Sequence, residues 1–576
     1  MPHRAHLFSL RISHALRESC IAEPYGRRRF TADVLAGITV GIIAIPLAMA
    51  LAIASGVAPQ YGLYTAIIAG FVIALTGGSR YSVSGPTAAF VVILYPIAQQ
   101  YGLAGLLLAS LMAGGMLVGM ALMRIGRFIE YVPQPVTLGF TAGIAVVIAT
   151  LQVKDLFGLP IETMPEDFAA KIHLLVSTLP GIHWPSLLVA AVTLLILLWP
   201  RLKTPLPPQL PAVVIGSLVA LGLGLAGQDV ETIGSRFSYL LPDGSLGSGI
   251  PPYLPAFEWP WRQPGADGEP LGISWQLVRE LLPAAFAIAM LGAIESLLCA
   301  VVLDGMSGKR HSANSELLGQ GIGNLITPFF GGITATAALA RSAANYQAGA
   351  QSPVASMVHA GVLLLALVAL APLLAYLPMA TMAALLLVVA WNMSEAPKAL
   401  RLVRTAPRGD LLVFATCFLL TVVVDMVVAI TTGVLLAAVL FVREIAEMTR
   451  VQDISEDRGL VPTPVPEGWL VYRITGPLFF AAADGVFAEL AQAAKDHDGL
   501  IVDMSGVTVM DAGGLSAFIR LAEHCKDTHC RLRVADLQFQ PLRTLARAGV
   551  TPEPGVLTFH ASLAAAISTE NEGSAD

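Results

Sequence analysis

The sequence is poor in charged residues. Asp, Glu, Lys and Arg make up 13% of the 576 residues, about half of the ~25% that is typical of soluble domains. Hydrophobic residues make up 55%, and the mean hydropathy is +0.70. Such a composition argues against a soluble enzyme and predicts a polytopic α-helical membrane protein.

Cysteines and enzyme-like motifs are also scarce. The five cysteines are scattered and odd in number, which argues against a disulfide framework. The formal net charge of -6 gives no indication of nucleic-acid binding. A Walker loop and a nucleophile–base pair are both missing, so we predict neither an enzyme nor an ATP-driven pump, and no cofactor. The stretch "HCKDTHC" holds zinc-ligand residue types at His524, Cys525, His529 and Cys530. Their adjacent spacing favours buried or neutral side chains over a zinc site.

Apolar runs follow one another from about residue 32 to residue 442, with no cleavable signal before the first. They predict fourteen membrane segments, several of which are shorter than the roughly 20 residues that cross a bilayer. The segments lie near 33–55, 60–77, 84–99, 102–123, 132–153, 185–200, 210–227, 281–302, 314–329, 335–350, 354–376, 378–393, 410–429 and 430–447.

Basic residues gather in alternate connections between these segments. Because basic loops stay in the cytoplasm, both termini are predicted to be cytoplasmic, with 1–30 as a cytoplasmic segment and 229–278 as an external loop. The membrane domain then spans 31–448. The residues that set this orientation are Arg27, Arg28, Arg29, Arg80, Arg124, Arg127, Arg201, Lys203, Lys309, Arg310, Lys398, Arg401, Arg404 and Arg408.

The composition changes after Arg450. Residues 449–466 read as a charged linker, and 467–566 as a small soluble domain. Strands are predicted at 470–475, 500–505 and 531–536, with helices at 484–495 and 513–525 between them. This alternation predicts an α/β domain. The polar tail 567–576 is predicted to be disordered.

Two segments are short and interrupted by glycine or proline. "YSVSGPTAAFVVILYP" (Tyr81–Pro96) contains Gly85-Pro86, and "FFGGITATAALARSAAN" (Phe329–Asn345) contains Gly331-Gly332. Each is third in a set of seven, if the halves are about 31–228 and 279–448. Seven-span halves enter the membrane from opposite sides, so the pattern predicts an inverted repeat. Matched interrupted segments are typical of a transporter's binding site.

Short helices that begin within the bilayer have a direct electrostatic consequence. A helix N-terminus offers free N–H groups and about half a positive charge. Two such ends at the midplane would bind an anion without a lysine. Pro86 suits a helix start, and Thr87 and Thr336 could add hydroxyl donors. The alternative is a pair of kinked but ordinary spans.

Ionisable residues occur inside two of the segments. Glu295 lies well within 281–302, where a charged carboxylate costs several kcal/mol, about 3 on insertion scales. It is a candidate proton acceptor, and the alternative is a structural carboxyl bonded to a neighbouring helix. Arg341 either adds positive potential to the site or extends to the cytoplasmic interface. Asp425 is predicted to be interfacial.

These residues resemble the sulfate permease (SulP) family of anion transporters with a C-terminal STAS domain. The motifs are "GVAPQYGLYTA", "TGGSRYSVSGPTAAF", "GAIESLLCA", "NSELLGQGIGNLITPFFGGITATAALARSAAN", "GPLFFAAA" and "VMDAGGL". The likeness looks strongest to the DauA (YchM) type, bacterial aerobic transporters of four-carbon dicarboxylates such as succinate and fumarate.

The resemblance implies a fold and a mechanism. It implies a seven-plus-seven inverted repeat of fourteen spans, with a core domain (spans 1–4 and 8–11) that moves against a gate domain like an elevator. It also implies a homodimer in the bacterial inner membrane and a proton as coupling ion, with sodium as the alternative. The substrate site would include Leu47, Met49, Pro86, Thr87, Ala88, Thr336, Ala338, Leu339, Ala340 and Arg341, with Glu295 for proton coupling.

The sequence departs from sulfate-type members in ways that bear on the substrate. "PLAMAL" places Leu47 and Leu51 where those members have Gln and Tyr, and Ala338 and Ala340 stand where they tend to have serine. A more apolar lining favours a dicarboxylate over sulfate. Sulfate or bicarbonate transport, a passive anion channel, and a membrane-anchored regulator remain as alternatives.

The turn at the start of the helix predicted over 513–525 lacks hydroxyl groups. Related bacterial STAS proteins carry a phosphorylated serine in an Asp-Ser-Ser-Gly-like turn, whereas this chain has Asp511-Ala512-Gly513-Gly514. That phosphorylation switch is therefore excluded at this turn. The domain is expected to pack against the membrane unit or to dock a cytoplasmic partner.

Overall fold

A computed structural model describes residues 10–126, 132–161, 163–165, 167–199, 207–241, 245–424, 426–461 and 463–568. The chain divides into two compact units, Met1–Val434 and Leu435–Asp576, and each is described here by itself. The predictions for Arg127, Arg201, Lys203 and Asp425, and for most of the 567–576 tail, concern residues outside these ranges.

The first unit is helical, and its helices overlap each of the fourteen predicted apolar segments. By length and composition, eight helices of the described chain could cross a membrane, or nine if the bent pair Phe168–Gly181 and Trp184–Leu198 is one span. The number fourteen and the inverted repeat stay predictions. The helices that correspond to the segments are α3 (Arg27–Ala54), α4 (Pro59–Thr76), α5 (Ala88–Leu122), α6 (Gln134–Phe157), α8 (Trp184–Leu198), α9 (Gln209–Leu225), α11 (Trp275–Ser307), α12 (Ala313–Ile326), α13 (Leu339–Gln347), α14 (Val354–Leu374), α15 (Met379–Met393), α17 (Arg408–Val423) and α18 (Met426–Met448).

Helix α5 contains two of the predicted segments. Gly102 has φ 65° and ψ -162° inside it, which breaks the helical path between 84–99 and 102–123. A Cβ on Gly102 would lie 2.3 Å from the backbone carbon of Gly265, so the loop that contains Gly265 approaches too closely for any side chain. The first piece of α5 is therefore a short helix of about four turns at ~3.6 residues per turn.

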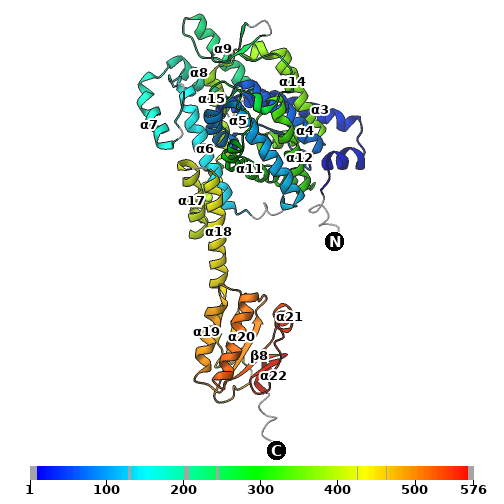
Figure 1. The fold of residues 1–576 in the computed structure, drawn as a ribbon, viewed down its shortest axis with the longest axis vertical. Coiled ribbons are helices and arrows are strands. Elements are labelled where there is room, and N and C mark those ends of the chain that lie inside the picture. Colours follow the sequence, from blue (N-terminus) through cyan, green and yellow to red (C-terminus); the bar gives the residue numbers. More distant parts are fainter. Residues whose placement is uncertain are drawn as a thin grey trace, which may run out of the picture. The chain divides into compact units, whose positions relative to one another are not determined.

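The helices form two packed groups (Figure 1). In the first, α5 packs on α11 and α12, and α14 packs on α3 and α4. In the second, α6 packs on α15 and α17, and α8 packs on α9 and α15. We call the set α3, α4, α5, α11, α12, α13 and α14 the core group, and the set α6, α8, α9, α15 and α17 the gate group. The core group consists of the helices of predicted spans 1–4 and 8–11, and the division into moving core and gate domains stays a prediction.

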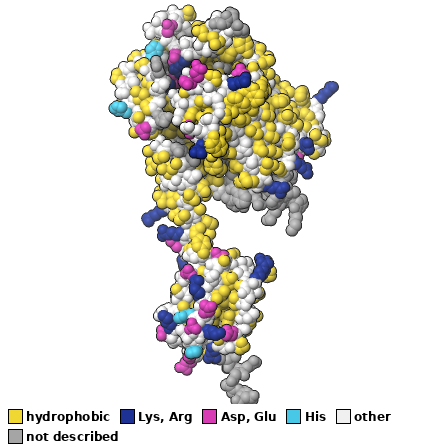
Figure 2. Space-filling model, in the orientation of Figure 1, with side chains coloured by type: hydrophobic (Ala, Val, Ile, Leu, Met, Phe, Trp, Pro, Cys, Tyr) yellow, Lys and Arg dark blue, Asp and Glu magenta, His cyan; other side chains and the backbone are white. Residues whose placement is uncertain are grey.

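Large hydrophobic side chains are exposed along the helices of this unit. Leu35, Leu195, Leu365 and Leu419 are each more than half exposed. Figure 2 shows hydrophobic side chains over much of the visible face of this unit, whereas charged residues are mixed more densely on the second unit. Apolar surface of this extent needs lipid around it. The chain is accordingly a multi-pass membrane protein.

The second unit is an α/β domain built on a five-stranded sheet of order β5-β6-β7-β8-β9. Strand β5 is antiparallel to β6, and the other neighbours are parallel. Helices α19 and α20 pack against one face, where Phe487 and Phe518 meet edge to face at 6.0 Å. Helix α22 covers the other face, where Leu563 contacts the cluster of Trp469 and Val471. The elements are β5 (Arg450–Asp453), β6 (Trp469–Thr475), α19 (Ala483–Ala494), β7 (Gly499–Gly506), α20 (Ala512–Asp527), β8 (Arg531–Ala535), α21 (Phe539–Arg547), β9 (Leu557–His560) and α22 (Leu563–Ser568).

Several elements lie where the sequence predicted none. Strand β5 occupies the start of the predicted linker 449–466, because Arg450–Asp453 pairs with Tyr472–Thr475 along the edge of the sheet. Two short helices of the first unit, α7 (Phe168–Thr178) and α16 (Ala396–Thr405), are amphipathic, and at 11 and 10 residues each is too short to cross a membrane alone. The predicted external loop also contains a small hairpin, β2 (Ser238–Leu240) with β3 (Leu246–Ser248).

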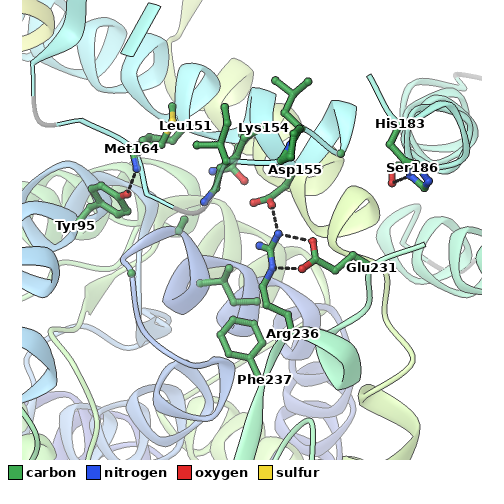
Figure 3. A pocket seen from close by; sticks show the side chains of 18 of the residues that line it. Tyr95, Leu151, Lys154, Asp155, Met164, His183, Ser186, Glu231, Arg236 and Phe237 are labelled. Carbon is green, nitrogen blue, oxygen red and sulfur yellow. Dashed lines mark hydrogen bonds and ion pairs between the residues drawn. The ribbon is translucent and has the colours of Figure 1, made fainter. Parts of the chain in front are cut away.

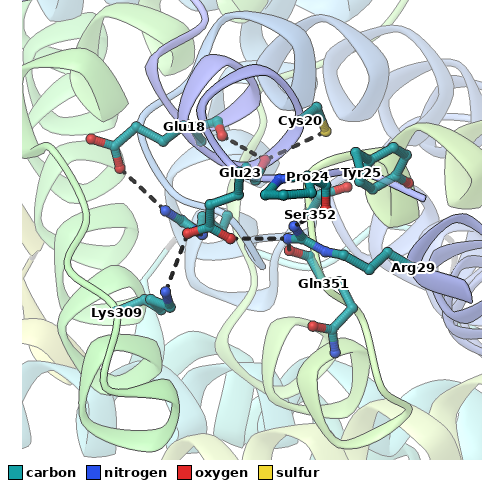
Figure 4. A network of polar contacts seen from close by, with 12 residues as sticks. Glu18, Cys20, Glu23, Pro24, Tyr25, Arg29, Lys309, Gln351 and Ser352 are labelled. Carbon is teal, nitrogen blue, oxygen red and sulfur yellow. Dashed lines mark hydrogen bonds and ion pairs between the residues drawn. The ribbon is translucent and has the colours of Figure 1, made fainter.

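An ion-pair network ties the N-terminal segment to the core group (Figure 4). The Glu23 carboxylate lies 2.8 Å from Arg80 Nη1, 3.3 Å from Arg29 Nη2 and 3.2 Å from Lys309 Nζ. The Arg80 guanidinium, more than the other cations, lowers the pKa of Glu23 from 4.5 to about 2. One carboxylate therefore joins the chain before α3 to the ends of α4 and α11.

We expect Glu23→Gln to lower the thermal stability of the purified protein at neutral pH by a modest amount, about 1 kcal/mol, because the group is partly exposed and screened. The folded pKa of Glu23 lies below the unfolded one, so its contribution is present above about 4.5 and is lost as the pH falls towards 2. The difference between variant and wild type should vanish across that range in thermal unfolding. Glu447→Gln, which removes the exposed i,i+4 pair with Arg443, should show no such pH-dependent difference.

Candidate functional site

Two unwound segments cross at the centre of the core group. Ser84–Gly85 (β1) pairs antiparallel with Thr336–Ala337 (β4), with Ser84 opposite Ala337 and Gly85 opposite Thr336. Helix α5 follows the first segment and helix α13 follows the second. All four paired residues are buried. The two interrupted segments of the sequence therefore meet, and both short helices begin at the crossing.

A polar stripe on α12 holds both unwound segments. Gln320 Nε2 donates to Ser84 Oγ at 3.0 Å, and Asn324 exchanges two hydrogen bonds of 2.8 Å with the backbone of Ala335. Glu316, one turn before Gln320, accepts from the N–H groups of Gly78 and Ser79 at 2.9 Å. The spacing of four residues places the three side chains on one face of α12. This stripe supplies partners to backbone that is neither helix nor sheet.

Two adjacent residues of α11 contact the two segments from the other side. Thr87 Oγ1 donates to Glu295 Oε2 at 3.1 Å. The next residue, Ser296, lies with its Oγ 2.6 Å from Thr336 Oγ1, and Thr336 also donates to the Gly292 carbonyl at 3.1 Å. Glu295 and Ser296 thus each fix the chain just before one short helix.

Neither short helix has a side-chain cap. The N-cap of α5 is Thr87, whose hydroxyl is directed to Glu295, and the N-cap of α13 is Ala338, which has no polar group. The N–H groups of the first turns therefore have no side-chain acceptor. Ala88, Ala89, Leu339 and Ala340 carry these turns and line a common cavity. Such a pair of helix ends favours a bound anion.

Arg341 adds a full positive charge at the same place. Its side chain is buried, with the residue 4% exposed, and Nη2 donates to the Pro86 carbonyl at 2.5 Å. Nε and Nη1 have no hydrogen-bond partner in the described structure. The sequence left two alternatives for the Arg341 side chain, the site or the cytoplasmic interface. In the structure it lies at the crossing of the two segments. A buried guanidinium with two free donors is suited to a planar or tetrahedral oxyanion.

The cavity has a volume of about 720 Å³ and lies between the core and gate groups. Its lining is mainly apolar, with Leu47 and Leu51 from α3 and Leu385 and Val389 from α15. Lys398 and Glu395 also line it, close to the start of α16. Of the predicted site residues, the cavity brings together Leu47, Pro86, Thr87, Ala88, Glu295, Ala338, Leu339, Ala340 and Arg341.

Two predicted site residues do not line this cavity. Met49 is 0% exposed in the hydrophobic core, because it lies about 200° around α3 from Leu47 at 100° per residue. Thr336 is also fully buried, and its hydroxyl is used by Ser296 and Gly292. Pro86 lies two residues before the first residue of α5 instead of opening the helix, and its carbonyl accepts from Arg341.

Sequence reasoning missed the residues that hold the crossing in place. Ser296, Gln320, Asn324 and Ser342 are each buried and hydrogen-bonded to an unwound segment or to a residue of it. Buried polar residues at i, i+4 spacing in an apolar helix were the available signal for Gln320 and Asn324. His359 on α14 is 0% exposed, and both of its ring nitrogens lack a partner in the described structure.

Comparison with known protein families shows the family to which this chain belongs. The profile described as "Sulfate permease family" matches residues 30–417, and that described as "STAS domain" matches residues 461–566. The chain belongs to the sulfate permease family. It is a secondary anion transporter of that family and not an enzyme.

Relatives of this chain carry names of inorganic-anion transporters. The "Putative sulfate transporter YvdB" of Bacillus subtilis (strain 168) is 39% identical over 93% of this chain and 97% of its own length. The bicarbonate transporter BicA of Picosynechococcus sp. is 27% identical over 90% of this chain and 91% of its own. These relatives are named as sulfate and bicarbonate transporters, and the predicted place in the DauA subgroup finds no support among them. These bacterial relatives suggest the cytoplasmic membrane.

Solved structures share the fold. The overall structure of SLC26A9 aligns with a TM-score of 0.81 at 18% identity, over 97% of this chain and 93% of that one. The transmembrane domain of a cyanobacterial bicarbonate transporter BicA aligns with a TM-score of 0.59 at 26% identity, over 72% of this chain and 98% of that one. The predicted polytopic domain followed by an α/β STAS domain is therefore confirmed at the level of fold.

Proposed function

We propose that this protein transports a small inorganic oxyanion, of the sulfate or bicarbonate class, across the cytoplasmic membrane. The observation that carries the proposal is the crossing of two uncapped helix starts beside the free donors of Arg341. The names of the relatives support the choice of substrate class. In this account the substrate lies against Ala88 and Ala340, with Arg341 beside it.

We further propose that a proton is coupled to transport through Glu295. Its carboxyl shares the cavity with Arg341 and accepts from Thr87. An ionised Glu295 would repel an incoming anion and offset the positive charge of Arg341, whereas the neutral acid would not. Protonation of Glu295 would therefore favour anion binding, and release of the anion would favour loss of the proton. The core group then moves against the gate group to expose the site to each side in turn.

A dicarboxylate is a second candidate, and one observation favours it. The cavity lining is mainly apolar, and both positions near Arg341, Ala338 and Ala340, carry alanine side chains without a polar group. A four-carbon dicarboxylate would place its methylene or vinylene middle against Leu47 and these alanines, whereas a compact hydrated dianion would leave that surface unused. The cavity of about 720 Å³ has room for either class.

Competition for uptake into proteoliposomes separates the two candidates. We expect unlabelled sulfate or bicarbonate to inhibit uptake of the labelled anion at least tenfold more strongly than succinate, fumarate or aspartate. Uptake should continue against a concentration gradient when the outside is acidified, which a passive channel cannot do. Stronger competition by succinate than by sulfate and bicarbonate would replace the first candidate with the second. A protein that lacks residues 465–576 and still transports would argue against the alternative of a membrane-anchored regulator whose STAS domain is the active element.

A further inference from the structure

A second, polar pocket lies at the C-terminal end of α3 (Figure 3). Its volume is about 640 Å³, and it is lined by the end of α3, the first piece of α5, the end of α6 and the segment around Arg236. Arg236 is held by Asp155 Oδ1 at 2.7 Å and by Glu231 Oε2 at 2.5 Å. The basic-loop pattern assigns this end to the outside of the membrane.

A thin apolar layer separates this pocket from the central cavity. On α3, Leu51 lines the central cavity and Ala54 lines the outer pocket, which is a separation of about 4.5 Å at 1.5 Å per residue. On the facing helices, Val91 of α5 and Ile144 and Ile148 of α6 lie between residues that line one pocket and residues that line the other. All three are at most 1% exposed and belong to one hydrophobic cluster.

A hydrogen bond at the edge of the outer pocket joins α5 of the core group to the connection that follows α6 of the gate group. The N–H of Met164, in the connection from α6 to α7, donates to the Tyr95 hydroxyl at 3.2 Å. Tyr95 lies eight residues after Thr87 on the first piece of α5, so it moves with the helix whose start forms the anion site. Figure 3 shows the Tyr95 ring and Met164 facing each other at the edge of the pocket.

Tyr95 is distinguished from a second tyrosine on the same helix. Tyr101 donates to Glu280 on α11 at 3.0 Å, so its contact lies within the core group and does not cross to the gate group. When the core group moves against the gate group, the bond from Tyr101 is kept and the bond to Tyr95 must break. The two tyrosines thus differ in the one property that matters for an outer gate.

We propose that the polar pocket is the outer vestibule of the transport path, sealed from the central cavity by the layer of Val91, Ile144 and Ile148, and that the Tyr95–Met164 hydrogen bond holds this seal closed. The proposal rests on the proposed function, because it assumes that the core group moves. The ligand of the vestibule is the same hydrated anion on its way to or from the central site.

Labelling of cysteines from the outside of the membrane tests the gate without any transport measurement. In full-length protein whose five cysteines are replaced, Ala54→Cys reports on the vestibule and Leu47→Cys on the central cavity. With Tyr95→Phe, a membrane-impermeant thiol reagent outside should modify Leu47→Cys about fivefold faster, the factor that corresponds to one hydrogen bond of about 1 kcal/mol. Tyr101→Phe should leave this rate within twofold of the parent.

Three results would overturn the proposal. Ala54→Cys that stays unreactive from outside in every background would remove the vestibule. Equal labelling rates for Leu47→Cys with Tyr95 and with Tyr95→Phe would show that the Tyr95–Met164 hydrogen bond does not hold the seal closed. An equal acceleration by Tyr101→Phe would show the same. Because labelling needs no substrate, a Tyr95→Phe effect in a protein that carries no anion would refute the proposed function and leave the gate standing.

Discussion

Replacing Arg341 by glutamine is expected to raise the anion concentration for half-maximal transport by roughly 100-fold or more. Removing one partner from a buried, charge-assisted contact costs about 2–5 kcal/mol, and every 1.4 kcal/mol is about tenfold in affinity. The guanidinium has two free donors at the crossing and is 4% exposed, so solvent cannot replace it. Initial rates of labelled sulfate uptake over a range of concentrations give the measurement.

Two further variants separate charge from structure. Arg341→Lys keeps the charge but loses the planar fork and the geometry of the bond to the Pro86 carbonyl, so it should recover part of the affinity. Lys398→Gln removes a charge that lines the same cavity, but from a side chain that is 62% exposed. It should change the half-saturating concentration less than threefold. A loss as large in Lys398→Gln as in Arg341→Gln would mean that overall charge, and not the crossing, sets affinity.

Replacing Glu295 by glutamine is expected to abolish the acceleration of uptake by external acid. Glutamine keeps a carbonyl that accepts from Thr87 and resembles the protonated acid in charge, so the variant should bind the anion as well at high pH as at low pH. Wild-type uptake should fall as the pH rises and Glu295 ionises, whereas the variant should show a flat profile and no uphill uptake driven by protons. Sulfate is the suitable substrate, because its charge stays constant around neutral pH.

Glu280→Gln provides the matched control for this experiment. Glu280 lies on the same helix, α11, and accepts from Tyr101 at the exposed end. Its replacement should leave the pH profile unchanged. An acid-accelerated rate that persists in Glu295→Gln would show that the proton is carried elsewhere, and the buried His359 would then be the next residue to test.

Much of the membrane unit could be predicted from the sequence because long apolar runs have few alternatives. The two interrupted segments were marked by Gly85-Pro86 and Gly331-Gly332, because glycine and proline both weaken a helix. Glu295 and Arg341 were visible as charges within apolar sequence. Each of these signals lies within a short stretch of sequence, so it can be recognised without knowledge of the tertiary structure.

The parts that could not be predicted depend on which way a side chain faces. Met49 and Leu47 lie on the same apolar helix. Tertiary packing alone decides that Met49 faces the hydrophobic core and Leu47 faces the cavity. Thr336 looked like a ligand because its distance from Ser296 is invisible in sequence. Strand β5 was hidden in a charged segment, since an edge strand needs only one paired side.

Substrate protection of an engineered thiol tests the central claim, that an anion is held where α5 and α13 begin. In the protein with its five cysteines replaced, Ala338→Cys lies at the N-cap of α13, and Thr39→Cys lies farther along the same cavity on α3. We predict that a saturating concentration of the transported anion slows thiol modification of Ala338→Cys at least fivefold and leaves Thr39→Cys within twofold. An anion that is transported by Ala338→Cys but protects neither thiol, or protects both equally, would contradict the account.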